Sequence, residues 1–265
     1  DGLIFQITNK IFTTVIGVIL IFAIWWILSL VFDVNNMVIP NPVETIVAAI
    51  NLLGKPYTYK SIGFTLLRVL LGFGFSFVLA LILGIIAGNF EPFSNVLKPS
   101  LVFMKCIPTA AIIFLFAVLV GSQNASTLVT ILVSFPILYE AVFNGMKNVP
   151  QNVSWAEKID GANFFKRNFF VHLPLSIPYI VVGILSSFSL SFKVEIMSEI
   201  ISGSTNHGIG SAIKGAINAD ATNMLDVFAY SLITILIVII ITSIALILKK
   251  ILSNKFPTLE DIKIL

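Results

Sequence analysis

The chain has 265 residues, of which 57% are hydrophobic and only 11% are charged, and its formal net charge is +3. Because a soluble domain carries about 25% charged residues, this composition excludes an ordinary soluble enzyme and indicates an integral membrane protein. A helix needs about 20 apolar residues to cross the hydrocarbon core of a bilayer. We therefore predict an all-α fold in a single transmembrane domain, residues 1–265, with six spans near 11–32, 64–88, 99–120, 126–145, 173–195 and 226–249.

The first span, 11–32, is too long for the apolar core of a signal peptide and lacks a small-residue cleavage site, so we expect a retained helix. The chain begins with Asp1, and we expect its natural start to lie upstream. After this span, Pro40 and Pro42 precede apolar residues at helical spacing. This pattern predicts a short helix at the outer membrane interface.

The second span, 64–88, contains four glycines, which either let a neighbouring helix approach closely or are simply tolerated. In the third span, Pro99 and Pro108 should start or kink the helix. The polar stretch at 121–126 should divide spans three and four into a hairpin.

Lys105 lies inside the third span, where a bare ammonium group would be costly. Its side chain either extends to the lipid headgroups or lines a translocation cavity, together with Pro108. The second alternative would suit an anionic solute.

The longest strongly polar stretch follows span four, in a loop at 147–172. Ser154 and Glu157 form a capping box, so a helix should begin at Trp155. Ile159 and Ala162 share one face with Trp155, while Gly161 weakens the helix. On periodicity alone, this is a helix lying on the inner membrane surface.

The outer end of span five carries Lys193, Glu195 and Glu199. These residues either pair with one another and cap the following segment, or form part of a gate or of a docking surface for an external protein. The polar segment after them should be a re-entrant or interfacial hairpin.

The basic residues indicate the orientation, because Lys and Arg accumulate in cytoplasmic loops. With the N-terminus inside, ten basic residues fall on the inner side and five on the outer side. We therefore expect both termini in the cytoplasm, contacts with membrane lipids and no nucleic-acid partner.

Motifs for catalysis are missing from the sequence. The chain has no phosphate-binding G-x-x-x-x-G-K-[ST] motif, so it is not expected to hydrolyse ATP or to be an enzyme. His172 and His207 are predicted on opposite sides of the membrane, so no metal site is expected. Cys106 is the single cysteine, which excludes an internal disulfide.

The polar loop resembles the cytoplasmic loop of the permease subunits of binding-protein-dependent ABC importers, whose motif is E-A-A-x3-G-x9-I-x-L-P. Gly161, nine residues and the sequence at 171–174 fit its second half. In the first half, Ala156 matches, whereas Trp155 replaces the usual glutamate and Glu157 replaces the second alanine. Flanking segments, such as "IPNPVETIVAAI" and "SEIISGSTNHGIGSAI", resemble the nitrate, sulfonate and taurine branch.

The resemblance implies a type I permease of the bacterial inner membrane that works as a homodimer. Its partners would be two copies of an ATPase, which bind ATP and Mg, and an external or lipid-anchored substrate-binding protein. The loop would be the coupling helix that docks into the ATPase. The residues implied in that contact, or in setting the exit angle of span five, are Trp155, Ala156, Glu157, Ile159, Gly161, Ala162, Leu173 and Pro174.

Two alternatives stay open. Glu157 either caps its own helix or meets a basic residue of the ATPase. A rival function is an ion channel or secondary transporter that uses Lys105, Lys193 and Glu199 as its ion site, although the duplicated halves usual in such carriers are missing from the sequence. The resemblance fits nitrate, sulfonates, thiamine precursors and flavins equally well, so the solute is not assigned.

Overall fold

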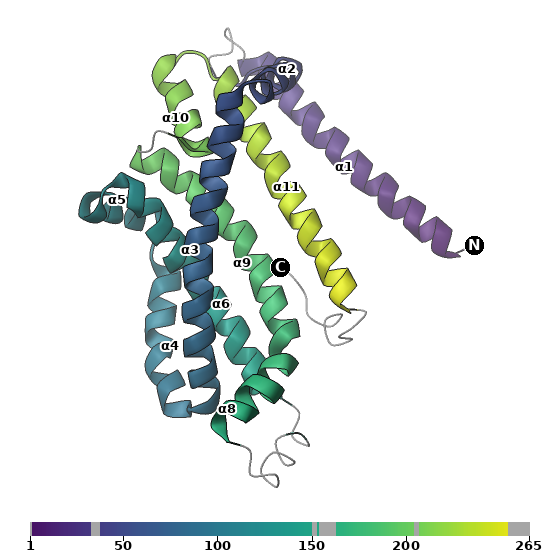
Figure 1. Ribbon diagram of the computed structural model, residues 1–265. Helices are drawn as coiled ribbons and strands as arrows, with labels where there is room; N and C mark the ends of the chain where they lie inside the picture. Colours follow the sequence, from purple (N-terminus) through teal and green to yellow (C-terminus); the bar gives the residue numbers. More distant parts are fainter. Residues whose placement is uncertain (1, 33–37, 150–152, 154–162, 204–206, 254–265) are drawn as a thin grey trace. The chain divides into compact units, whose positions relative to one another are not determined.

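The computed structural model describes residues 2–32, 38–149, 153, 163–203 and 207–253, and within these ranges every regular element is a helix (Figure 1). The predicted coupling residues between 155 and 162 and the capping box at Ser154 lie outside the described residues. The elements are α1 (Gly2–Phe32), α2 (Pro42–Leu53), α3 (Pro56–Asn89), α4 (Glu91–Cys106), α5 (Thr109–Val120), α6 (Ser122–Lys147), α8 (Phe164–Arg167), the π-helix η1 (Asn168–His172), α9 (Leu173–Ser202), α10 (Ile209–Ala219) and α11 (Leu225–Ser253).

Among the described residues, five helices are long and apolar enough to cross a membrane, and the bent pair of α4 and α5 makes a sixth candidate span. The two helices of this pair meet at an angle of 96°. The break lies at Ile107 and Pro108, where Ile107 has an extended backbone with ψ of 130°. A residue before proline is forced out of the helical region, so Pro108 ends α4 and α5 starts afresh at Thr109.

Pro99 does not start the third span, which was one of the two alternatives expected for it. The helix α4 begins eight residues earlier, at Glu91, and passes through Pro99 without ending. A proline in the first turn, Pro92, supports this earlier start, because its fixed φ suits the beginning of a helix.

The chain divides into two compact units, of which the first comprises residues 1–59 and 212–235. Within it, α2 confirms the short helix expected after Pro40. Asn41 caps this helix, because its Oδ1 accepts a hydrogen bond of 2.9 Å from the backbone N–H of Val43. Before α11, the Asp220 carboxylate accepts hydrogen bonds from the backbone and hydroxyl groups of Thr222, which lower the pKa of Asp220.

The second unit comprises residues 60–211 and 236–265, and α6 packs along α9 in its core. Small residues bring these two helices together. A methyl group added at Gly183 would overlap Ala141, and one added at Gly145 would lie 2.7 Å from Ser176. In a membrane, where the hydrophobic effect does not drive helices together, such close backbone contact is a main source of packing energy.

Both roles expected for the glycines of the second span, close packing and simple tolerance, occur in α3. A Cβ at Gly72, Gly84 or Gly88 would lie within 3.0 Å of α6, so these three residues permit close packing. Gly74 has nothing within 4 Å and is simply tolerated.

The helix that follows the polar loop is continuous with span five. The residues from Phe164 to Ser202 form one apolar helical run of 39 residues, which includes α8, η1 and α9. Leu173 is the first residue of α9, and Pro174 lies in its first turn, where its missing N–H costs no helical hydrogen bond.

Candidate functional site

A buried ion pair joins α3 to α9 near the C-terminal end of α9, the end that is expected on the outer side. The Arg68 Nη1 lies 2.7 Å from the Glu199 Oε1, and the exposed fractions of the two side chains are 16% and 0%. Thr65, one turn before Arg68, donates its hydroxyl to the same carboxylate at 2.9 Å. The two α3 residues face Glu199 together because positions three apart share one face of a helix.

The start of α10 completes this network. The backbone N–H of Gly210 donates to the Glu199 Oε2 at 2.8 Å, and the N–H of Ile209 donates to the Thr65 hydroxyl at 2.9 Å. Arg68 also donates to the carbonyl of His207 at 2.9 Å. We call Thr65, Arg68, Glu199 and the backbone at 207–210 the outer network; it fixes the segment after α9 to both α3 and α9.

Glycines let the backbone reach the carboxylate. Gly203 ends α9 with φ of 70°, a left-handed conformation that other residues adopt at a cost. At Gly210, an added Cβ would overlap the carbonyl oxygen of Ile196. A larger side chain there would therefore push the N–H of residue 210 away from Glu199.

Glu195 lies one turn before Glu199 and is also completely buried. Thr130 of α6 donates its hydroxyl to the Glu195 Oε2 at 2.7 Å. Lys193, by contrast, is exposed. Glu195 and Glu199 therefore lie in the interior between the packed helices. Within the described residues, Glu199 forms its ion pair with Arg68 rather than with Lys193.

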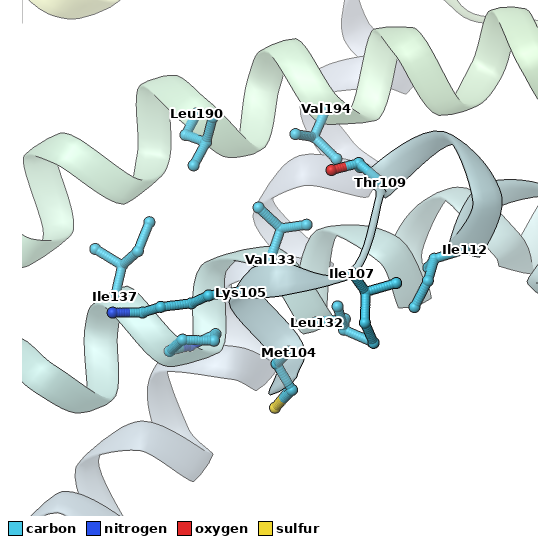
Figure 2. Close-up of a pocket in the computed structure, with 11 residues that line it drawn as sticks. Met104, Lys105, Ile107, Thr109, Ile112, Leu132, Val133, Ile137, Leu190 and Val194 are labelled. Carbon is cyan, nitrogen blue, oxygen red and sulfur yellow. The ribbon is translucent and has the colours of Figure 1, made fainter. Parts of the chain in front are cut away.

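A cavity of about 310 Å³ lies between α4, α5, α6 and α9 (Figure 2). Its walls are mainly aliphatic, with Ile112, Val133 and Val194 on three of the helices, and Thr109 adds a hydroxyl. The break between α4 and α5 shapes the cavity, because Ile107 at the break and Thr109 just after it both line the wall.

Lys105 enters this cavity from the last turn of α4, and Figure 2 shows its side chain extended toward α6 near Ile137. Its Nζ lies 2.5 Å from the Glu140 Oε1 of α6. The two side chains remain 41% and 46% exposed. The sequence predicts that Lys105 either extends to the lipid headgroups or lines a cavity. In the structure it lines this cavity and pairs with the carboxylate of Glu140. Cys106, the next residue, is an exposed free thiol.

Sequence reasoning missed three residues of these sites. Arg68, Thr65 and Glu140 are not among the predicted site residues. The signal for Arg68 is a charge within the long apolar helix α3, because a charge inside a span usually has a partner. For Glu140, the signal is the same, since this carboxylate lies inside the spanning helix α6.

The helices and the composition define an all-α, multi-span membrane protein, as expected for the type I ABC permease fold. Close helix packing and the buried ion pair of Arg68 and Glu199 hold its helices together. A family model for the binding-protein-dependent transport system inner membrane component matches residues 80–256. The chain belongs to this family and is a multi-pass protein of the bacterial inner membrane.

Curated relatives come from several bacteria. The putative aliphatic sulfonates transport permease SsuC of Bacillus subtilis is 26% identical over 205 residues, which cover 77% of this chain and 73% of the relative. The nitrate import permease NrtB of Synechocystis is 26% identical over 234 residues, covering 83% and 82%. A probable ABC transporter permease of Brucella abortus is 27% identical over 185 residues, covering 69% and 73%. These relatives support the nitrate and sulfonate branch.

Proposed function

We propose that the chain is the transmembrane subunit of an ATP-driven importer, which moves a small solute from an external binding protein into the cytoplasm by alternating access. Two permeases would form the path and two ATPase subunits would supply the energy through the loop at 147–172. Both termini would then be cytoplasmic, and residues 1–265 would act as a single transmembrane domain. The observation that supports this proposal is that the chain belongs to the family of binding-protein-dependent transport inner membrane components.

For the inner side, we propose that the loop contacts the ATPase through Trp155, Ala156, Glu157, Ile159, Gly161 and Ala162. An exposed tryptophan and isoleucine on one helix face would otherwise form an apolar patch without a partner. Leu173 and Pro174 would set the angle of span five, and the continuous helix from Phe164 to Ser202 supports this role.

For the outer side, we propose that the outer network anchors the hairpin that closes the path. Glu199 supports this role, since it binds α3 and the backbone of Gly210 at the same time. Glu195 would hold α9 against α6 beneath it through Thr130. Lys193, being exposed, would face the binding protein or water.

For the path itself, we propose the cavity beside Lys105 and Pro108. Charged groups in a span face water or a protein interior rather than lipid, because solvating them in hydrocarbon is costly. Lys105 and Glu140 are both partly exposed and lie on spanning helices, so their face is best covered by the aqueous path or by the second permease.

The rival ion-site function is supported less well. It requires Lys105, Lys193 and Glu199 to act together on an ion. Lys105 and Glu199 are each held by an opposite charge, Glu140 and Arg68 respectively, and Lys193 is exposed.

Purification with the neighbouring gene products tests the proposed function. We expect an ATPase subunit to remain bound to the detergent-solubilised chain and to be lost on Trp155→Arg or Gly161→Pro. Lys60→Ala, on the proposed outer side, serves as the control and should retain it. Uptake by the chain alone, driven by a sodium or proton gradient, would contradict the proposal.

The Lys105 and Glu140 pair should matter for transport more than for stability. Partly exposed ion pairs contribute about 0–1 kcal/mol, so we expect Glu140→Gln to change the free energy of unfolding by less than about 1 kcal/mol. The unpaired Lys105 should nevertheless alter uptake in proteoliposomes that contain the complete complex. Unchanged uptake of all solutes carried by the binding protein would exclude Glu140 from the path.

A further inference from the structure

Three polar side chains connect the end of α3 to the helix that returns from the cytoplasmic loop. The Arg167 Nη2 donates to the Asn89 Oδ1 at 2.6 Å, and the Asn89 Nδ2 donates to the Asn168 Oδ1 at 2.8 Å. We call Asn89, Arg167 and Asn168 the corner bracket. All three belong to the second unit, and Asn89 is the last residue of α3.

Burial and further hydrogen bonds distinguish the corner bracket from an incidental contact at the surface. Asn168 is completely buried, and its Nδ2 donates to the carbonyl of Phe164 at 2.9 Å. Asn89 uses both ends of its amide. Its Oδ1 accepts from Arg167, and its Nδ2 donates to Asn168 and also to the carbonyl of Ile85 at 2.8 Å. Buried polar groups are costly unless they are hydrogen-bonded, so these side chains resist separation.

An aromatic contact lies beside the bracket. The rings of Phe90 and Phe164 stack with their centroids 6.0 Å apart. Phe90 is the single residue between α3 and α4, so the contact joins the return helix to the corner from which α4 starts. The return helix is therefore linked to this corner by two kinds of contact, side-chain hydrogen bonds and ring stacking.

The position of the bracket along the chain suggests its role. Arg167 follows Gly161 by six residues and lies within the predicted coupling loop at 147–172. The loop is joined to α9 by the chain itself, through η1. The bracket adds a second connection, to α3 and α4, and α4 ends at Lys105 and Cys106 beside the cavity.

We propose that the corner bracket is a positioning device that transmits movement of the cytoplasmic loop to α3 and α4, so that the ATPase moves the cavity wall as well as α9. This inference rests on the proposed function. Arg167 and Asn168 then have a role distinct from docking: they hold the corner against the return helix while the loop moves.

Cys106 offers a readout that does not require knowledge of the solute. It is the single cysteine of the chain, it is exposed, and it ends α4. The rate at which N-ethylmaleimide labels Cys106 in the purified complex, followed by mass spectrometry of its peptide, reports movement of this end. We expect ATP with vanadate to change the labelling rate at least threefold in the wild-type complex.

Two variants test the bracket. Asn168→Leu and Arg167→Ala should reduce the nucleotide-dependent change to less than 1.5-fold, while the ATPase subunit stays bound and hydrolysis stays within twofold of wild type. Arg167→Lys keeps a charged donor and should retain part of the response. Lys166→Ala, an exposed neighbour, is the matched control and should respond like wild type.

The possible results separate the bracket from the proposed function. A full labelling response in Asn168→Leu and Arg167→Ala, or no response in a wild-type complex that hydrolyses ATP, overturns the bracket and leaves the importer proposal standing. Loss of the ATPase subunit from both variants assigns them to folding or docking and also overturns it. A wild-type chain that binds no ATPase overturns the importer proposal itself and the bracket's role with it.

Discussion

Glu199→Ala is expected to destabilise the folded protein by about 3–5 kcal/mol, the cost typical of removing one partner from a buried ion pair. Arg68 would keep its charge with only 16% of its side chain exposed. Thr65 and the N–H of Gly210 would lose their acceptor as well. Reversible unfolding in mixed micelles measures this change.

The size of the effect distinguishes the ion pair from ordinary interhelical hydrogen bonds. In membrane proteins these average about 0.6 kcal/mol, so Thr65→Val should cost far less than Glu199→Ala. The double variant Arg68→Met with Glu199→Leu removes both charges and should be more stable than Glu199→Ala alone. If Glu199→Ala costs no more than Thr65→Val, the charge pair does not hold the outer network together.

Gly183→Leu is expected to disrupt the packing of α6 against α9. Even a methyl group at Gly183 would overlap the side chain of Ala141, so a leucine forces the two helices apart. Overpacking a well-filled core costs about 1–3 kcal/mol and occasionally more. Here the obstacle lies on a neighbouring helix, so we expect a loss of at least about 3 kcal/mol or a failure to fold. The fraction of monodisperse protein after detergent extraction shows how much of the variant still folds.

Gly74→Leu is the matched control, since it makes the same chemical change in another spanning helix. Gly74 is exposed and has nothing within 4 Å of the Cβ position. Leucine also forms helices better than glycine, by about 1 kcal/mol or slightly less. This variant should therefore be as stable as wild type. Equal losses at both positions would show that the close contact at Gly183 is not what makes it sensitive.

Much of the helical order could be predicted because hydropathy and capping are local properties. Apolar runs indicated where the spanning helices lie, and the prolines at 40 and 42 indicated α2. The sequence does not show why the helix breaks at Pro108 but continues through Pro99, Pro136 and Pro178, which all lie inside helices. A proline breaks a spanning helix only where the neighbours do not satisfy the freed backbone groups, and that depends on packing.

The partners within the candidate site could not be predicted for a different reason. Arg68 and Glu199 are 131 positions apart, and Lys105 and Glu140 are 35 apart. Which side chains meet depends on how each helix is rotated about its axis, and one sequence does not specify this rotation. The sequence did single out Glu199 and Lys105, because a charge in an apolar span is conspicuous whether or not its partner is known.

The continuous helical run from Phe164 to Ser202 is long enough for a small tilt to move its ends far. Arg167 and Glu199 are 32 residues apart on it, which corresponds to about 48 Å at about 1.5 Å per residue. A tilt of about 5° about the N-terminal end of this run would displace its C-terminal end by about 4 Å, more than the full length of a hydrogen bond. A rod of this length cannot tilt appreciably while every contact of Glu199 keeps its present geometry. A change in the tilt of this one helix at Arg167 therefore requires the contacts of Glu199, at its other end, to rearrange.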